Sequence, residues 1–556
     1  MEKISGILRA NDGLFLEIVV ATIGILFFVT LEIITVPMFD DVDIAYQLGT
    51  VYAFLEGYGF SHVFSTSADD LSLLEYDAIT QWPHAYPLFT SLVYLFTQDI
   101  ILSRLVLQIF FIALFFVSML SILRSLRSHL GLIARLGLLI FWMLFADPFR
   151  KPTEIMALSL LYASLACVLH GLKGDRSIVW VLLAGVLSGI AGMTRYIYIT
   201  YIAIFPLIAL VLALYYKKWS FLRDGILFVI SAGGIVIANL LYNMRVAGTA
   251  TRTDMVDGGL FWSNLLLAHP IGNSAVGTGR GWTYIADALQ FDSSPLLWFF
   301  SCVIIALLIW MTYRTVHNWI EQRASHSLPA SPDVVIVLFG FLLMLITMSV
   351  LIALSIINRP LPNPDGSYRT FITNERYYVP TAVWIAVIFA LFLRNYANAR
   401  TNMTRFLRRI VYFCLCFMLP GIILTGVLTM TTVRFRASTA GFYISEQQFG
   451  QAEAIFGALQ RVDDEPSVVI AGTFFDPVKF RYLTILSGNI LYTGELSRDT
   501  DFSSSTPITV LVAFPQGLSS DSDEFNALQN LLSTYESEKY DEIDGFLDFY
   551  RVSITP

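Results

Sequence analysis

Long apolar runs recur along this chain and are separated by short polar turns. A helix needs about 20 residues to cross the apolar core of a bilayer, which is about 30 Å thick. The pattern predicts about eleven membrane-spanning helices, several of them short, near residues 14–36, 105–123, 136–146, 154–171, 178–194, 197–216, 225–242, 295–313, 334–357, 379–393 and 410–433. The predicted fold class is a polytopic α-helical membrane protein.

The pattern changes beyond Arg434, where Ser, Asp and Glu become frequent and the apolar runs shorten. Helical periodicity alternates there with short β-branched runs. These patterns predict helices near residues 446–460 and 522–535, and strands near 467–471, 508–514 and 545–554. We therefore divide the chain into a transmembrane module, residues 1–435, with a long first loop at 37–103, and a small soluble α/β domain, residues 436–556.

Composition narrows the functional class. Of the 556 residues, 56% are hydrophobic and only 14% are charged, which is far more apolar than a soluble domain. The net charge is -8 and the basic residues are scattered, so nucleic-acid binding is excluded. All four cysteines lie in apolar segments, which argues against a disulfide framework and against a cysteine-rich metal site.

The first loop sets the orientation of the chain in the membrane. Residues 37–103 contain nine acidic residues and not one Lys or Arg. Basic residues gather instead in the turns at 124–135, 173–176, 217–223, 314–323 and 394–409. The positive-inside rule therefore places the amino terminus in the cytoplasm and the first loop outside, and an odd number of helices places the carboxy terminus outside as well. The predicted external segments contain no Asn-x-Ser/Thr sequon, which favours a bacterial plasma (inner) membrane.

An acidic cluster, Asp40, Asp41 and Asp43, directly follows the first helix. Adjacent carboxylates at a membrane boundary suit general-base work, because each disfavours ionisation of the other and low polarity raises the pKa further. Carboxylate oxygens equally suit a divalent cation, for which Asp40 and Asp41 are the candidate ligands. A third interpretation is a solvated acidic loop that only reinforces the topology. The residues alone leave all three open.

Basic residues persist on the external side, where the charge bias disfavours them. The candidates are Arg104, Arg150, Arg195 and Arg376. Arginine matches phosphate oxygens with two parallel hydrogen bonds, so these side chains could bind a phosphate at the membrane surface. They could equally extend from helix ends to lipid headgroups.

Other ionisable residues near these arginines are further candidates. Asp147 and Glu154 flank Arg150 in the sequence. An ionised acid at a membrane boundary costs free energy, so each of the two acids is either paired with Arg150 or has a function. His84 lies on the external side without the spacing of metal ligands, which favours a structural role. The carboxylate of Glu17, inside the first helix, also costs free energy to place in the membrane, but the sequence indicates no partner for it.

Several motifs resemble, in their order and spacing, the GT-C superfamily of membrane glycosyltransferases, especially bacterial relatives of the protein O-mannosyltransferases and the lipid A aminoarabinose transferase. These motifs are FDDVD, LEGYGF, QWPHAYPLFTSLVYLF, SRLVLQIFF, RKPTEIMALSLLYASLA, LAGVLSGIAGMTRYIYI and NERYYVPTAVW. The resemblance covers residues 14–393. The tail matches only as the sort of small external domain that such enzymes often carry.

The resemblance implies a transferase that moves a sugar from a polyprenyl-phosphate donor to a glycan, lipid or protein acceptor outside the cytoplasm, with inversion. In the family the leading acid of the first-loop motif lies at the reacting centre. This position falls on Asp40, with Asp41 beside it and Asp43 as a further candidate. The external arginines would hold the donor phosphate, and Tyr377 in NERYYVP joins the candidates. The resemblance establishes no cofactor, and a divalent cation at the first two acids is compatible with it.

Two other classes remain as alternatives. A transporter or a lipid or polysaccharide flippase would also be polytopic, but transporters place ionisable groups near the bilayer midplane and often show internal repeats. Here the charges gather on one face and no repeat is evident. The other alternative is a non-enzymatic assembly or receptor component whose tail is a binding module.

Overall fold

The computed structural model divides the chain into two compact units. The helical unit consists of Met1–Ile33 and Gln108–Thr432, and the sheet unit of Ile34–Leu107 and Val433–Pro556. The first loop thus groups with the carboxy-terminal segment, which a division of the chain at residue 435 would separate. The structure describes all residues except 1, 35–41, 67–69, 127–129, 145–150, 173–176, 251–259, 266–293, 324–331, 359–360, 363–367, 370–378, 396–404, 413–415, 417–453, 460–467, 472–482, 485–486, 488, 493–495, 498–499, 501 and 544–546.

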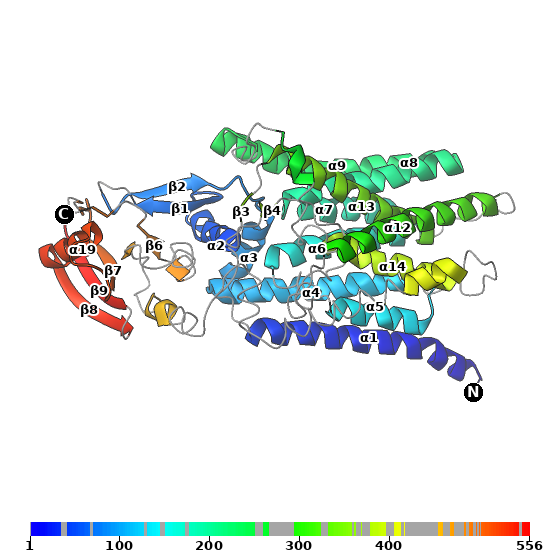
Figure 1. Ribbon diagram of the computed structural model, residues 1–556, viewed down its shortest axis with the longest axis horizontal. Coiled ribbons are helices and arrows are strands. Elements are labelled where there is room, and N and C mark those ends of the chain that lie inside the picture. Colours follow the sequence, from blue (N-terminus) through cyan, green and yellow to red (C-terminus); the bar gives the residue numbers. More distant parts are fainter. Residues whose placement is uncertain are drawn as a thin grey trace. The chain divides into compact units, whose positions relative to one another are not determined.

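The long helices of the helical unit lie side by side along one direction (Figure 1). The helices are α1 (Glu2–Ile34), α4 (Ile100–Ser125), α5 (Leu132–Leu144), α6 (Pro152–Gly171), α7 (Ser177–Gly192), η3 (Tyr196–Ala203), α8 (Ile204–Tyr216), α9 (Trp219–Ala247), η4 (Trp262–Leu265), α12 (Ser294–Arg323), α13 (Pro332–Ile357) and α14 (Val379–Asn395). Here η denotes a 3-10 helix. Two short antiparallel strands, β3 (Leu361–Pro362) and β4 (Tyr368–Arg369), follow α13.

Within the described part of the chain, six helical segments are long and apolar enough to cross a membrane. They are Gly13–Thr30, Ile100–Ser125, Pro152–Gly171, Tyr196–Tyr216, Trp219–Ala247 and Pro332–Ile357. The first ten predicted helices all coincide with helices of the structure, whereas most of the eleventh, 410–433, lies outside the described residues. The predicted polytopic helical fold class is confirmed.

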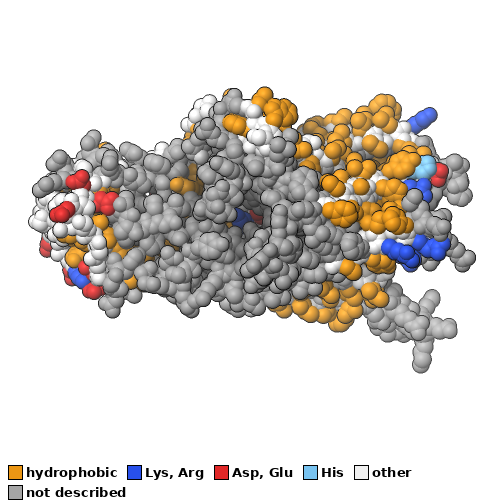
Figure 2. All heavy atoms as spheres, in the orientation of Figure 1, with side chains coloured by type: hydrophobic (Ala, Val, Ile, Leu, Met, Phe, Trp, Pro, Cys, Tyr) orange, Lys and Arg blue, Asp and Glu red, His pale blue; other side chains and the backbone are white. Residues whose placement is uncertain are grey.

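The surface of the helices is apolar. Figure 2 shows a band of hydrophobic side chains over them, with Lys, Arg and His side chains gathered at one end. Large side chains such as Phe110, Leu214 and Ile230 are 58%, 71% and 63% exposed. An apolar surface of this extent is stable in lipid, where helices satisfy their own backbone hydrogen bonds.

A buried ion pair joins α1 to α5. Arg135 Nε donates to Glu17 Oε1 at 2.5 Å, and the two side chains are 6% and 4% exposed. Arg135 also donates through Nη1 to the carbonyl oxygen of Leu130. The charge of Glu17 in the first helix is thus neutralised by Arg135, which lies far from it in sequence.

We expect Glu17→Gln to lower the free energy of unfolding by about 3 to 5 kcal/mol, because the arginine stays buried without the Glu17 carboxylate. The measurement is the thermal unfolding midpoint of the purified protein in nanodiscs. The double replacement Glu17→Leu with Arg135→Leu should recover most of the loss, since apolar residues of similar volume often replace a buried ion pair without cost. An unchanged midpoint in the single variant would contradict a stabilising role for the pair.

The first loop is folded around a β-hairpin in the sheet unit. Its elements are α2 (Val42–Leu55), β1 (Ser61–Thr66), β2 (Leu74–Ala78) and α3 (Ala85–Thr97). Helix α2 ends before Gly57 and Gly59, whose φ angles of 92° and 71° suit glycine. The antiparallel hairpin of β1 and β2 was not predicted. Its strands are short and carry polar residues on both faces, so no clear alternation marks them.

The carboxy-terminal part of the sheet unit contains a five-stranded mixed sheet of order β6-β5-β7-β9-β8. Its elements are β5 (Val468–Ala471), β6 (Ile490–Leu491), β7 (Ile508–Pro515), α19 (Asp523–Thr534), β8 (Glu536–Ile543) and β9 (Leu547–Ile554). Strands β6, β5 and β7 are parallel, whereas β9 is antiparallel to both β7 and β8. The predicted strands β5, β7 and β9 and the predicted helix α19 are confirmed. Strand β8 was not predicted because ESEKYDEI is largely charged, a composition that protects an exposed sheet edge.

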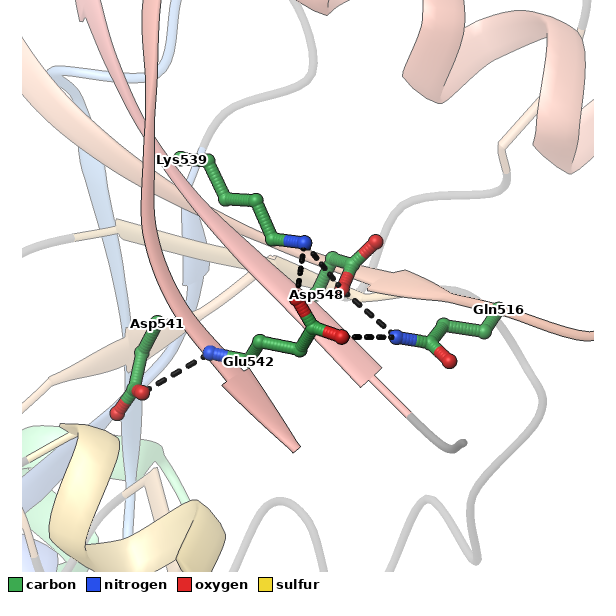
Figure 3. Close-up of polar contacts among 5 residues, drawn as sticks. All are labelled: Gln516, Lys539, Asp541, Glu542 and Asp548. Atoms are coloured by element: carbon green, nitrogen blue, oxygen red, sulfur yellow. Dashed lines mark hydrogen bonds and ion pairs between the residues drawn. The ribbon is translucent and has the colours of Figure 1, made fainter. Parts of the chain in front are cut away.

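A polar cluster connects the edge strand β8 to its neighbours (Figure 3). Lys539 Nζ lies 2.5 Å from Glu542 Oε2 and 3.1 Å from Asp548 Oδ1 on β9. Gln516, directly after β7, donates to Asp548 Oδ1 at 2.8 Å. The two carboxylates raise the pKa of Lys539, so this cation is fixed at neutral pH. Because the cluster is exposed, its contribution is to the register of the strands rather than to overall stability.

Candidate functional site

A buried ion pair lies in the helical unit where α6 begins. Arg195 Nη1 lies 2.9 Å from Glu154 Oε1 and donates to Thr153 Oγ1 at 3.4 Å. The side chain of Glu154 is 4% exposed and that of Arg195 is 17% exposed. The Glu154 side chain is therefore shielded from solvent, while part of the Arg195 side chain stays accessible.

The start of α6 favours an acid at this position. Lys151 is the N-cap residue, Pro152 is the first residue of the helix, and Glu154 lies in the first turn. Proline pre-sets the backbone for a helix start and has no N–H group to leave unpaired. The positive end of the helix dipole then stabilises the carboxylate of Glu154.

Arg195 lies at a junction between two helices. α7 ends at Gly192, η3 begins at Tyr196, and Arg195 between them has an extended backbone with φ -150° and ψ 125°. η3 and α8 together form the apolar segment Tyr196–Tyr216, which is long enough to cross a membrane. Arg195 directly precedes this segment and Lys217 directly follows it, so the two cations lie at its opposite ends.

Buried tyrosines hold the neighbouring helices together. The rings of Tyr198 and Tyr201 pack edge to face at 5.2 Å and are 2% and 1% exposed. Tyr201 Oη lies 3.0 Å from Thr347 Oγ1 on α13. On α6, Tyr162 Oη donates to the carbonyl oxygen of Pro380, in the first turn of α14, at 2.8 Å. The start of α14 is therefore fixed against α6.

The structure describes part of the predicted site. Six candidates lie outside the described residues: Asp40, Asp41, Asp147, Arg150, Arg376 and Tyr377. For Asp43 it describes the backbone, in the first turn of α2. Arg104, His84, Glu154 and Arg195 are described, and the structure brings the last two together. The roles predicted for all these residues stay predictions.

His84 and Arg104 belong to the sheet unit. His84 is 4% exposed, its ring stacks on Phe60 with centroids 4.5 Å apart, and its Nε2 donates to the carbonyl oxygen of Ile79 at 2.7 Å. These contacts connect the end of the hairpin to the start of α3. Arg104 is also 4% exposed and lies in the second turn of α4.

Two described acids of the first loop have shifted pKa values. Hydrogen bonds from Ser505 and Ser72 hold the pKa of Asp70 well below its ordinary value of 3.8, so this carboxylate is an anion at neutral pH. Partial burial raises the pKa of Glu56 above its ordinary value, although most of the side chain is at the surface. Asp70 is thus a fixed hydrogen-bond acceptor, which suits a structural contact better than proton transfer.

The predicted divalent-cation site cannot be built from the described side chains. Among them, no group of three or more His, Cys, Asp or Glu is close enough to hold a metal ion. Asp40 and Asp41, the predicted ligands, lie outside that part of the chain. A cation at these two acids stays a prediction.

Sequence reasoning did not find the partner of Glu154. It offered the neighbouring Arg150, whereas the structure pairs Glu154 with Arg195. The predicted order of membrane spans was consistent with this pairing, because it places the starts of α6 and of η3, and hence Glu154 and Arg195, at the same end of the helices. Which of the arginines at that end reaches Glu154 depends on how α6 and α7 pack, and no local pattern encodes that choice.

No protein-family model matches the chain, and no curated protein matches it in sequence. Solved structures do match. The chain is similar to ArnT from Cupriavidus metallidurans bound to undecaprenyl phosphate, with 11% identity, a TM-score of 0.47 and 98% of each chain covered.

Two structures from Archaeoglobus fulgidus also match. The oligosaccharyltransferase AglB, in complex with an inhibitory peptide and a dolichol-phosphate, shares 10% identity at a TM-score of 0.41, over 96% of this chain and 74% of that chain. The oligosaccharyltransferase in complex with Zn and sulfate shares 11% identity at a TM-score of 0.46, over 89% of this chain and 67% of that chain.

Proposed function

We propose that this protein is a GT-C-type membrane glycosyltransferase that moves a sugar from a polyprenyl-phosphate donor to a glycan, lipid or protein acceptor. The observation that carries the proposal is the partly exposed side chain of Arg195, whose guanidinium pairs with the buried Glu154 at one end of membrane-length helices. An arginine fixed at the boundary of an apolar helix is suited to the phosphate of a donor whose chain stays in the lipid.

Two more of the predicted phosphate-binding arginines, Arg150 and Arg376, lie outside the described residues. We propose that they join Arg195 in holding the donor phosphate.

The bound phosphate would serve as the leaving group. The acceptor hydroxyl oxygen attacks the anomeric carbon, the bond from that carbon to the phosphate oxygen breaks, and the phosphate leaves with the electron pair. Arg195 and the other predicted phosphate-binding arginines stabilise the charge that develops on that oxygen. Asp40, or Asp41 beside it, takes the proton of the hydroxyl. A divalent cation at these two acids would instead polarise the reacting groups.

Orientation follows from the positions of the charges. Lys217 and Arg195 lie at opposite ends of Tyr196–Tyr216, and the turns at the Lys217 end are basic. The positive-inside rule places that end in the cytoplasm and Arg195 outside. We therefore propose an amino terminus in the cytoplasm, an extracytoplasmic carboxy-terminal domain and a bacterial plasma membrane.

The test uses the full-length protein in nanodiscs with radiolabelled undecaprenyl-phosphate mannose, glucose, galactose and aminoarabinose. Bacterial envelope extract supplies the acceptors, and chromatography follows the label. We expect one donor to be consumed, with the label in a new product and undecaprenyl phosphate released. In proteoliposomes without an acceptor, we expect none of these lipids to change leaflet. Lipid movement without any transfer of label would contradict the proposal and favour a transporter.

A further inference from the structure

The loop between β1 and β2 inserts a leucine into the core of the carboxy-terminal sheet. Leu71 is 1% exposed and belongs to the same hydrophobic cluster as Val510 on β7, Leu528 on α19 and Val552 on β9. A residue of the first loop thus completes a core whose other members come from residues after 467.

Polar contacts on both sides of Leu71 fix its insertion. Its backbone N–H donates to the carbonyl oxygen of Ser503 at 2.9 Å. The Asp70 Oδ1 atom accepts from the backbone N–H of Ser505 at 3.0 Å and from the hydroxyl of Ser72 at 2.6 Å. The hydroxyl oxygens of Ser72 and Ser505 lie 3.0 Å apart. We call Asp70, Leu71, Ser72, Ser503 and Ser505 the loop clamp.

The loop clamp is connected to α2 through packed elements of the sheet unit. Asp70 to Ser72 lie at the turn of the hairpin, whose strands pair antiparallel. β1 packs against α2 and also against β6 of the carboxy-terminal sheet, and α2 packs against α3. On α2, Leu48 and Val51 are fully buried. The first turn of α2 contains Asp43 of the acidic cluster.

We propose that the loop clamp is a positioning device: the carboxy-terminal domain holds the hairpin, and through it α2, in the arrangement that transfer requires. The inference rests on the proposed function. It gives the carboxy-terminal domain a role in the reaction itself, in place of a separate binding module. A side chain displaced by about 1 Å can slow an enzyme about 100-fold, so an anchor distant from the chemistry can control its rate.

The test removes the clamp and then rebuilds it covalently. Asp70→Ala with Leu71→Ala deletes the carboxylate and the inserted side chain. Adding Ser72→Cys and Ser505→Cys to this variant provides a disulfide at positions whose hydroxyl oxygens lie 3.0 Å apart. All four native cysteines lie between residues 167 and 416, so the sheet unit contributes none that could compete.

We expect the variant without cysteines to lose about 10- to 100-fold in the maximal rate of transfer, while its affinity for undecaprenyl phosphate stays unchanged. In the variant with the cysteine pair, oxidation should restore the rate and dithiothreitol should abolish it again. Variants with only one of the two cysteines are the controls and should respond to neither reagent. The yield of the disulfide is measured separately by mass spectrometry.

Two results would overturn the positioning role: an unchanged rate in the variant that lacks the clamp, or a complete disulfide that restores no activity. A failure of the proposed function would give a different experimental result. In that case the unaltered protein transfers no sugar from any donor of the panel, whereas the disulfide yield still reports whether the loop is held against the sheet.

Discussion

Asp40→Asn is expected to lower the rate of sugar transfer by about 100- to 10,000-fold, the range that a general base contributes. Asparagine keeps the shape of the side chain and its hydrogen-bonding capacity, but it cannot take the proton of an acceptor hydroxyl. The measurement is the initial rate of label transfer from the donor that the unaltered protein uses. We expect a smaller loss for Asp41→Asn, because Asp41 lies beside the leading acid of the motif.

The matched control is Glu56→Gln, which removes the same charge from an exposed acid of the same loop. Its rate should stay within about twofold of the unaltered protein, since it keeps the hydrogen-bonding shape and lies at a surface position. Full activity in both the Asp40 and the Asp41 variants would overturn the assignment of the base. A loss confined to Asp43→Asn would move the assignment to that third acid.

Arg195→Gln is expected to weaken the binding of undecaprenyl phosphate by about 10- to 100-fold, the range for a lost hydrogen bond to a charged group. The same change leaves the carboxylate of Glu154 buried without the guanidinium that lies 2.9 Å away, so the protein should also unfold at a lower temperature. Native mass spectrometry measures the first effect and thermal unfolding in nanodiscs the second. Arg195→Lys keeps the charge but loses the planar fork, and we expect an intermediate affinity.

A second variant separates these two effects. In Arg195→Gln with Glu154→Gln, no uncompensated carboxylate remains, so stability should recover while phosphate binding stays weak. The control is Arg223→Gln, because Arg223 is 51% exposed and pairs with Asp224 near the Lys217 end. It should leave binding unchanged. Recovery of phosphate binding in the double variant would show that Arg195 serves only the structure.

The membrane part of the fold could be predicted well because its main cause is local. An apolar run of about 20 residues has few stable alternatives to a spanning helix, so α4, α6 and α13 follow from composition alone. In the carboxy-terminal domain, the strands β5, β7 and β9 were found because burial makes them apolar. The edge strand β8 escaped because its residues face solvent, and an alternation of Glu, Lys and Asp resembles a loop.

The contacts that assemble the candidate site were the harder part. The sequence indicated that Glu17 and Glu154 each require a cationic partner. The packing of separate helices determines that Arg135 pairs with Glu17 and Arg195 with Glu154. Leu71 is a similar case, since a single leucine in a polar loop carries no periodicity that would mark it as a core residue. Pairing across long stretches of chain depends on tertiary structure, and one sequence contains little information about it.

The position of β9 has a consequence for biosynthesis. β9 lies between β7 and β8, so the sheet cannot close, and Leu71 cannot find its complete core, until the chain has been made as far as Ile554. At about 5 to 20 residues per second, the ribosome needs roughly 25 to 100 s to travel from Leu71 to that point. Throughout this interval the first loop lacks the core in which Leu71 is buried. If the loop clamp has the positioning role proposed above, a nascent chain that stalls before β9 would contain its early helices and still lack an anchored first loop.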